Sequence, residues 1–266
     1  MVIKPTSAAV RALRFVRVVL HVVRAVAIAA TVYPFLTRAQ RSGHVRRWSK
    51  QLLAILGVRL KTNGAPPRDC DAPTMIVANH VSWLDIFALN SVHAMRFVAK
   101  SEIRQWPVIG RLSGKGGTLF VERTRHRHIA DVNREVAAAL RQGDIFAVFP
   151  EGKTTRGDVV LPFHASLLQP ALACNARLCP MAIRYTRADG SLCSEADYEG
   201  DKSLLDAFLL LLTQPVIHVQ LQFLPPLACN GAHRGELAYE ASRVIAGALN
   251  VPAPRRRTGK SSGRKA

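Results

Sequence analysis

The chain has 266 residues and a formal net charge of +19, and 48% of its residues are hydrophobic. This length and apolar content suit one medium-sized folded domain with a short appendage, and they exclude a wholly disordered chain. The five cysteines are an odd number with no CxxC pair, which indicates reduced thiols and argues against a disulfide framework or a zinc site. So positive a charge indicates an anionic partner, either nucleic acid or a lipid surface.

The positive charge is concentrated at the two ends of the chain. The first 68 residues contain thirteen Lys or Arg and no acidic residue. Residues 8–36 are mostly apolar, but basic side chains recur there at steps of three or four, which places them on one side of a helix. They are Arg11, Arg14, Arg17, His21 and Arg24. We therefore expect a helix that lies in the membrane interface with its arginines facing lipid phosphates.

The uncharged part of this first helix is too short to favour a membrane span. Its uncharged run covers only residues 25–36, whereas a span needs about 20 residues. A tilted span with Arg24 reaching the interface, and a signal peptide, stay open as alternatives. A second basic, amphipathic stretch follows over residues 39–56, with Trp48 as an interfacial anchor. Residues 1–60 are thus expected to form a basic, membrane-associated helical segment.

From about residue 74 short apolar runs alternate with helical patterns. The runs cover residues 75–79, 96–100, 117–123, 144–151, 179–185 and 217–224, and the helical patterns cover 83–93, 128–142, 166–175, 202–213 and 235–249. This alternation predicts an α/β fold over residues 61–252, with a central mixed β-sheet flanked by helices and the N-terminal helical pair beside it. The tail, residues 253–266, is basic and low in complexity, which predicts disorder.

The first candidate motif is Asn79-His80-Val81-Ser82-Trp83-Leu84-Asp85, in which Asn79 is expected to bind the substrate. Ser82 and Asp85 fit a capping box, with Ser82 as the N-cap and the Asp85 carboxylate reaching back toward the residues that enter the helix. Asp85 is then able to hold one ring nitrogen of His80 while the other takes a proton from a hydroxyl. His126 and Asp131 have the same spacing, but they lie in a charged, solvated stretch and are not expected to be catalytic.

Further polar residues follow other apolar runs, where α/β proteins place their sites. The run 117–123 begins with Gly117 and ends with Arg123, whose guanidinium is suited to gripping a phosphate. The run 144–151 leads into Phe149-Pro150-Glu151-Gly152-Lys153-Thr154, in which backbone N–H groups, Lys153 and Thr154 are able to hold an anion. Glu151 is able to fix a substrate hydroxyl or to orient Arg123. The last block, Cys179-Pro180-Met181-Ala182-Ile183, is a strand that begins with proline.

These four blocks, in this order, resemble the glycerolipid acyltransferase family over roughly residues 73–184. The resemblance implies that His80 is the general base and Asp85 its orienting carboxylate. It implies acceptor binding by the second and third blocks, on which Gly117, Arg123, Glu151 and Gly152 fall. Lys153 departs from the family's usual Gly-Thr continuation, which leaves the acceptor headgroup open. Glu122 stands where Asp is commoner.

The resemblance also implies an activity, partners and a location. The expected reaction moves a fatty acyl group from acyl-CoA or acyl carrier protein to 1-acyl-sn-glycerol-3-phosphate, giving phosphatidic acid, without a metal or other cofactor. Lyso-ornithine lipid is the alternative acceptor. Because both donors are cytosolic, we expect the protein on the cytoplasmic face of the inner membrane, bound to its anionic surface. A hydrolase, or a non-enzymatic protein that binds membranes or nucleic acid, remains a remote alternative, although no nucleic-acid motif is present.

Overall fold

The computed structural model describes residues 5–66, 73–106, 109–122, 126–198 and 203–255. Their centre is a seven-stranded sheet in the order β1-β7-β6-β2-β5-β3-β4. All neighbouring strands run parallel except β6 and β7, which are antiparallel. The mixed α/β sheet expected from the sequence is confirmed. The strands are β1 Val58–Asn63, β2 Thr74–Ala78, β3 Arg96–Lys100, β4 Leu119–Val121, β5 Ile145–Val148, β6 Arg177–Thr186 and β7 Ile217–Phe223.

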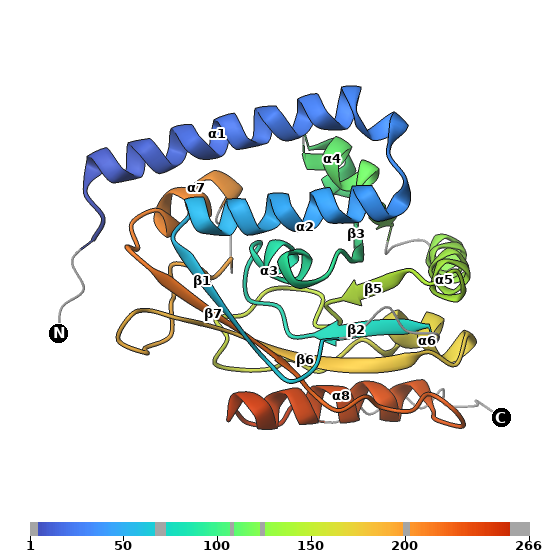
Figure 1. Cartoon of the computed structure of the whole chain (residues 1–266). Helices are drawn as coiled ribbons and strands as arrows, with labels where there is room; N and C mark the ends of the chain where they lie inside the picture. Colours follow the sequence, from blue (N-terminus) through green and yellow to red (C-terminus); the bar gives the residue numbers. More distant parts are fainter. Residues whose placement is uncertain (1–4, 67–72, 107–108, 123–125, 199–202, 256–266) are drawn as a thin grey trace.

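Helices cover both faces of this sheet, as Figure 1 shows. The α-helices are α1 Ala8–Thr31, α2 Arg38–Ile55, α3 Asp85–Val92, α4 Ile109–Lys115, α5 His126–Arg141, α6 Gln169–Ala173, α7 Leu204–Leu211 and α8 Arg234–Leu249. Short 3₁₀ turns occur at η1 Tyr33–Phe35, η2 Ser101–Gln105 and η3 Ala165–Leu168. The sequence patterns missed β1 and α4. The boundary expected between residues 60 and 61 lies inside β1, so the basic N-terminal segment contributes the start of a sheet strand.

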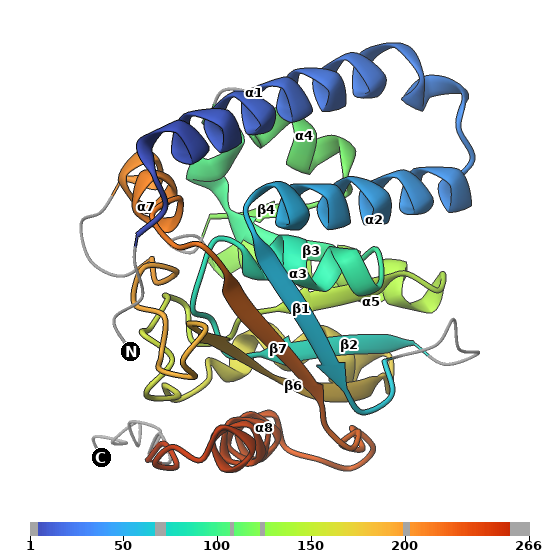
Figure 2. The ribbon, with the colours of Figure 1, turned by 60° about the vertical axis from the view of Figure 1, so that its left-hand side comes forward.

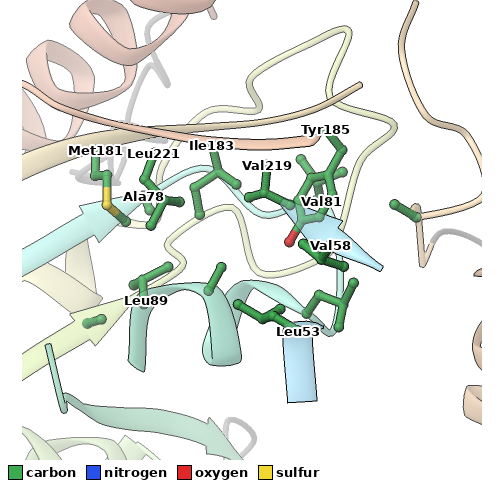
Figure 3. Packing of buried hydrophobic residues seen from close by; sticks show 14 of the residues in the cluster. Leu53, Val58, Ala78, Val81, Leu89, Met181, Ile183, Tyr185, Val219 and Leu221 are labelled. Atoms are coloured by element: carbon green, nitrogen blue, oxygen red, sulfur yellow. The ribbon is translucent and has the colours of Figure 1, made fainter. Parts of the chain in front are cut away.

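Two apolar clusters fill the space between the sheet and its helices. One lies between α2, α3 and the sheet face formed by alternate residues of β2, β6 and β7. Figure 3 shows part of it, with Leu53 from α2, Leu89 from α3, and Met181, Ile183 and Tyr185 from β6. The other lies on the opposite face, against α5, α6 and α8. Successive side chains of a strand point to opposite faces of the sheet. Every second residue of β6 therefore lies on the face that α2 and α3 cover.

Helix α1 lies over α2 and α4 on the outside of the helical layer (Figure 2). Two of its five basic residues bind the protein itself. Arg14 donates to the backbone oxygens of Gln214 and Pro215 at 2.7 and 2.8 Å. His21 is buried, stacks on Trp48 with the ring centroids 4.8 Å apart, and has its Nε2 3.0 Å from the backbone oxygen of Trp48. The expectation that the arginines of α1 face lipid phosphates is therefore wrong for Arg14, which holds α1 to the loop before β7. His21 also faces the protein, and it holds α1 to α2.

The opposite face of α1 is apolar and exposed. Leu20, for example, keeps 62% of its surface exposed, and the other large apolar side chains of this face are Leu13, Val16, Val19 and Val23. The remaining basic residues, Arg11, Arg17 and Arg24, are exposed as well. A helix that turns apolar side chains outward is unusual on a water-facing surface. Within the described segments, no helix combines the length and apolar content that a membrane span requires.

Candidate active site

The turn between β2 and α3 brings His80 and Asp85 together. The strand is buried along its whole length and so is Asn79 after it, which makes His80 the first residue here that reaches solvent. Nδ1 of His80 lies 2.7 Å from Oδ2 of Asp85. The same carboxylate oxygen accepts hydrogen bonds from the backbone N–H groups of Val81 and Ser82, at 2.9 and 3.1 Å. The five-residue spacing therefore closes a tight loop around one carboxylate oxygen.

The start of α3 differs from the expected capping box. The helix begins at Asp85 with Leu84 in the N-cap position, and no side chain caps it. Ser82 is therefore not the N-cap; its hydroxyl instead accepts from the N–H of Leu84 at 3.2 Å, inside the turn. The Asp85 carboxylate still binds the residues before the helix, as expected. It does so from the first helical residue, because the helix begins two residues later than a capping box at Ser82 would place it.

Burial distinguishes the roles that the two side chains are able to play. The side chain of His80 is 22% exposed, whereas that of Asp85 is fully buried. A carboxylate is only an acceptor, so the Nδ1 facing it carries a proton and Nε2 is left with its lone pair. The His80 ring also stacks on Phe149, with the ring centroids 4.2 Å apart and the planes 14° apart. His80 is thus held in one orientation as an accessible proton acceptor, with a buried negative charge behind it.

The loop after β5 holds the peptide of His80 from both sides. Oε1 of Glu151 accepts from the backbone N–H of His80 at 3.1 Å, and the N–H of Thr155 donates to the backbone oxygen of His80 at 2.9 Å. Oε2 of Glu151 is buried without a hydrogen-bond partner among the described residues. Burial is the largest cause that raises the pKa of Glu151 to about 8. Glu151 therefore binds the backbone of His80 directly, a contact that the sequence did not reveal.

The other residues that were expected to bind an anion in this loop, Gly152, Lys153 and Thr154, differ in their exposure and contacts. Lys153 is exposed, and its charge acts on Glu151. Thr154 is buried, and its hydroxyl donates to the backbone oxygen of Tyr198. Gly152 has a φ of +81°, a backbone conformation that favours glycine and lets the chain turn after Glu151. Lys153 and Arg156 are thus two cations that this loop presents to solvent.

Asn79 has a different role from the one expected of a substrate-binding residue. Its side chain is fully buried, donates to the backbone oxygen of Ile183 at 2.9 Å and accepts from the backbone N–H of Ile183 at 2.8 Å. These two bonds continue the β2–β6 pairing one residue past the end of β2. Asn79 therefore fixes the register of β6 beside the site.

The second motif lies away from β2 on the sheet, whereas the fourth motif belongs to β6, which pairs with β2. Gly117 precedes β4, with β3 and β5 between that strand and β2. Its backbone oxygen accepts from Nε of Arg96 at 2.7 Å. With a φ of +83°, and only 2.8 Å between a would-be Cβ and that Nε, the position requires glycine. Pro180 is buried in β6 opposite Val77. Arg123 lies outside the described residues.

Tyr185 is a site residue that the sequence analysis missed. Its hydroxyl donates to Oδ1 of Asp85 at 2.7 Å. It belongs to β6, whose alternate residues Met181, Ile183 and Tyr185 all lie in the α2–α3 cluster. That alternation was a usable signal, because a tyrosine on a buried strand face requires a partner for its hydroxyl. Which partner it finds is decided by the pairing of β6 with β2, residues that lie about 100 positions apart.

Comparison with known proteins places this arrangement in a family. Residues 59–184 match the family model described as "Acyltransferase". The chain is 37% identical over 204 residues to a lyso-ornithine lipid O-acyltransferase of Pseudomonas aeruginosa, covering 77% of each protein. It is 38% identical over 149 residues to a 1-acyl-sn-glycerol-3-phosphate acyltransferase of Neisseria gonorrhoeae, covering 56% of this chain and 58% of that protein. The chain belongs to the glycerolipid acyltransferase family.

The fold agrees with this assignment. The crystal structure of the 1-acyl-sn-glycerophosphate acyltransferase of Thermotoga maritima matches with a TM-score of 0.62 at 20% identity, covering 89% of this chain and 96% of that one. Among the described residues, no group of three or more His, Cys, Asp or Glu side chains is placed to hold a metal ion.

Proposed function

We propose that the protein transfers a fatty acyl group from a thioester carrier to the free hydroxyl of a lysolipid, with His80 as the general base. The observation that carries this proposal is the pairing of an accessible imidazole with a fully buried carboxylate, 2.7 Å apart. Membership of the acyltransferase family supports the reaction class. Acyl-CoA and acyl carrier protein are the proposed donors.

The reaction follows from the orientation of the His80 ring. Nε2 takes the proton of the acceptor hydroxyl while the hydroxyl oxygen attacks the thioester carbonyl carbon. The resulting imidazolium keeps its Nδ1 proton and is stabilised by the charge of Asp85, as in a catalytic triad whose serine is replaced by the substrate hydroxyl. When the tetrahedral intermediate collapses, the carbon–sulfur bond breaks and the leaving thiolate takes the proton from Nε2. The ester forms, and His80 returns to its starting state.

The proposed acceptor is 1-acyl-sn-glycerol-3-phosphate, which would give phosphatidic acid. The exposed Lys153, two residues from the glutamate that contacts the His80 peptide, supplies a cation for an anionic headgroup. Lyso-ornithine lipid is the second candidate acceptor. It is favoured by relatives with that name in Pseudomonas aeruginosa and Brucella abortus, which match over 77% and 85% of their own lengths.

We further propose that α1 binds the cytoplasmic face of the inner membrane. Its exposed apolar face would enter the interfacial region, and Arg11, Arg17 and Arg24 would lie near anionic headgroups. Arg14 and His21 would not, because they hold the helix to the protein. Both donors are cytosolic, and the acceptor is a membrane lipid, so this location would bring the two substrates together. Nucleic acid is not a proposed partner.

The test is acyl transfer by the detergent-solubilised full-length protein. Labelled acyl-CoA or acyl carrier protein is offered with each acceptor separately, and His80→Ala and His44→Ala are assayed in parallel. Product from lysophosphatidic acid that disappears only in His80→Ala supports the proposal and its first acceptor. Product from the ornithine lipid alone keeps the mechanism and replaces the acceptor. Full activity of a folded His80→Ala variant, or no product from either acceptor, overturns the proposal.

A further inference from the structure

The carboxylate of Asp85 receives more hydrogen bonds than its contact with His80 requires. Oδ2 accepts from His80 and from two backbone N–H groups. Oδ1 accepts from the hydroxyl of Tyr185 at 2.7 Å. An ionised carboxylate without exposed surface is costly unless its oxygens are hydrogen-bonded. The hydroxyl of Tyr185 is the donor that serves the oxygen facing away from His80.

The sheet, and not the substrate, places Tyr185 in this position. Its backbone pairs with Val219 of β7, and its backbone oxygen accepts from the N–H of Cys193 at 3.1 Å. Two residues earlier, Ile183 is held by both ends of the Asn79 side chain. Tyr185 is itself buried, at 2% exposure, so no substrate reaches it. The hydroxyl is thus fixed before any ligand binds.

We propose that Tyr185 is a positioning residue for the acyl transfer proposed above: its hydroxyl keeps the Asp85 carboxylate ionised and directed at His80. This inference depends on His80 and Asp85 acting as base and partner. Without the phenol hydroxyl, Oδ1 would be buried with no donor among the residues that the structure describes. The carboxylate would then rotate away from Nδ1 more easily or bind a proton itself, and either change would weaken the support for the imidazolium.

The surrounding groups leave Tyr185 as a neutral donor. Burial, and then the charge of Asp85, raise the pKa of Tyr185 well above its ordinary value, so the phenol keeps its proton. Cys193 faces the tyrosine from the loop after β6, and burial raises the pKa of its thiol to about 11, so it is also neutral. Glu151 faces Asp85 from the loop after β5, and burial raises its pKa to about 8. Glu151 is therefore the other group nearby that titrates in the working range.

The test is Tyr185→Phe, which keeps the ring and removes only the hydroxyl. We expect kcat to fall by roughly tenfold or more, with KM for donor and acceptor within about twofold, because the lost bond is to a charged group that acts in the transition state. Activity should also disappear at a higher pH when the solution is acidified, because a carboxylate that has lost a hydrogen-bond donor binds a proton more easily. Tyr239→Phe on α8 is the matched control and should change neither quantity.

Three outcomes decide the inference. An unchanged kcat, or a kcat that falls equally at every pH with the acid limb of the profile in place, overturns the positioning role in favour of packing alone. A shift of the acid limb that vanishes when Tyr185→Phe is combined with Glu151→Gln assigns the titration to Glu151 and overturns it as well. If His80→Ala is inactive while Tyr185→Phe keeps the kcat and pH profile of the wild type, only this inference is refuted. An active, folded His80→Ala variant refutes the proposed function.

Discussion

The turn at residues 79–85 and helix α1 distribute polar and apolar side chains in opposite ways. In the turn, Val81 and Leu84 are buried and one reactive group, the His80 ring, reaches the surface. In α1, polar side chains such as His21 face the protein, and apolar ones such as Leu20 face outward. The turn obeys the rule for a surface in water, whereas α1 does not. This difference is the basis of the proposal that α1, unlike the turn, contacts a membrane surface.

The largest effect is expected from a change of Asp85, the buried carboxylate of the turn. Asp85→Asn should lower kcat by about 10²- to 10⁴-fold, because the amide leaves the imidazolium of His80 without its negative partner. The matched control is Asp131→Asn, which changes the exposed Asp of the other His–Asp pair at this spacing. Steady-state acyl transfer measures both. Equal activity of the two variants would mean that the carboxylate behind His80 has no catalytic role.

A second change tests whether the turn depends on β6. Asn79→Ala should lower the free energy of unfolding by about 2–4 kcal/mol, because it leaves the buried backbone N–H and oxygen of Ile183 without partners. Urea unfolding followed by circular dichroism measures the loss. Asn133→Ala, which removes an exposed bond to Ser166, should cost much less. If the two variants lose similar amounts, Asn79 does not hold β6 as described.

A third change concerns the buried side-chain carboxyl group of Glu151, next to His80. Because burial raises the pKa of Glu151 from 4.5 to about 8, its folded form holds a proton that the unfolded chain releases. Its contribution to stability is therefore complete below about pH 4.5 and is lost as the pH rises through about 8. Relative to the wild type, Glu151→Gln should gain about 3 kcal/mol between pH 5.5 and 8.5.

The measurement is chemical unfolding of both proteins at the two pH values. Glu135→Gln, on the exposed side of α5, is the control and should show no such gain. A constant difference between Glu151→Gln and the wild type across this range would show that Glu151 is ionised throughout.

The smallest expected effect is on membrane binding, and it tests the exposed apolar face of α1. Leu20→Glu should weaken binding to vesicles of anionic lipid by about tenfold, because it puts a charge in the centre of the exposed apolar face. Leu192→Glu changes a leucine that is also exposed but lies in the loop after β6, so it should leave binding unaltered. Vesicle co-sedimentation measures both. Equal binding by Leu20→Glu and the wild type would remove α1 from the membrane contact.

Local patterns in the sequence predicted most of the elements. The apolar runs became β2 to β7, and the basic N-terminal stretches became α1 and α2. β1 was missed although apolar and basic residues alternate over 58–61, because this pattern is only four residues long. Its place depends on parallel pairing with β7, about 160 residues later. The mixed direction of the sheet was expected, but which strands are antiparallel depends on β6 and β7 together.

The candidate site divides in the same way. The sequence alone determined the pairing of His80 with Asp85, because five residues and a helix start bring them together through local geometry. Only the tertiary structure decided that Glu151 holds the His80 peptide, that Asn79 serves β6, and that Tyr185 completes the hydrogen bonds of Asp85. Contacts within one turn follow from chain geometry, whereas contacts between strands depend on register and burial, which the whole core sets at once.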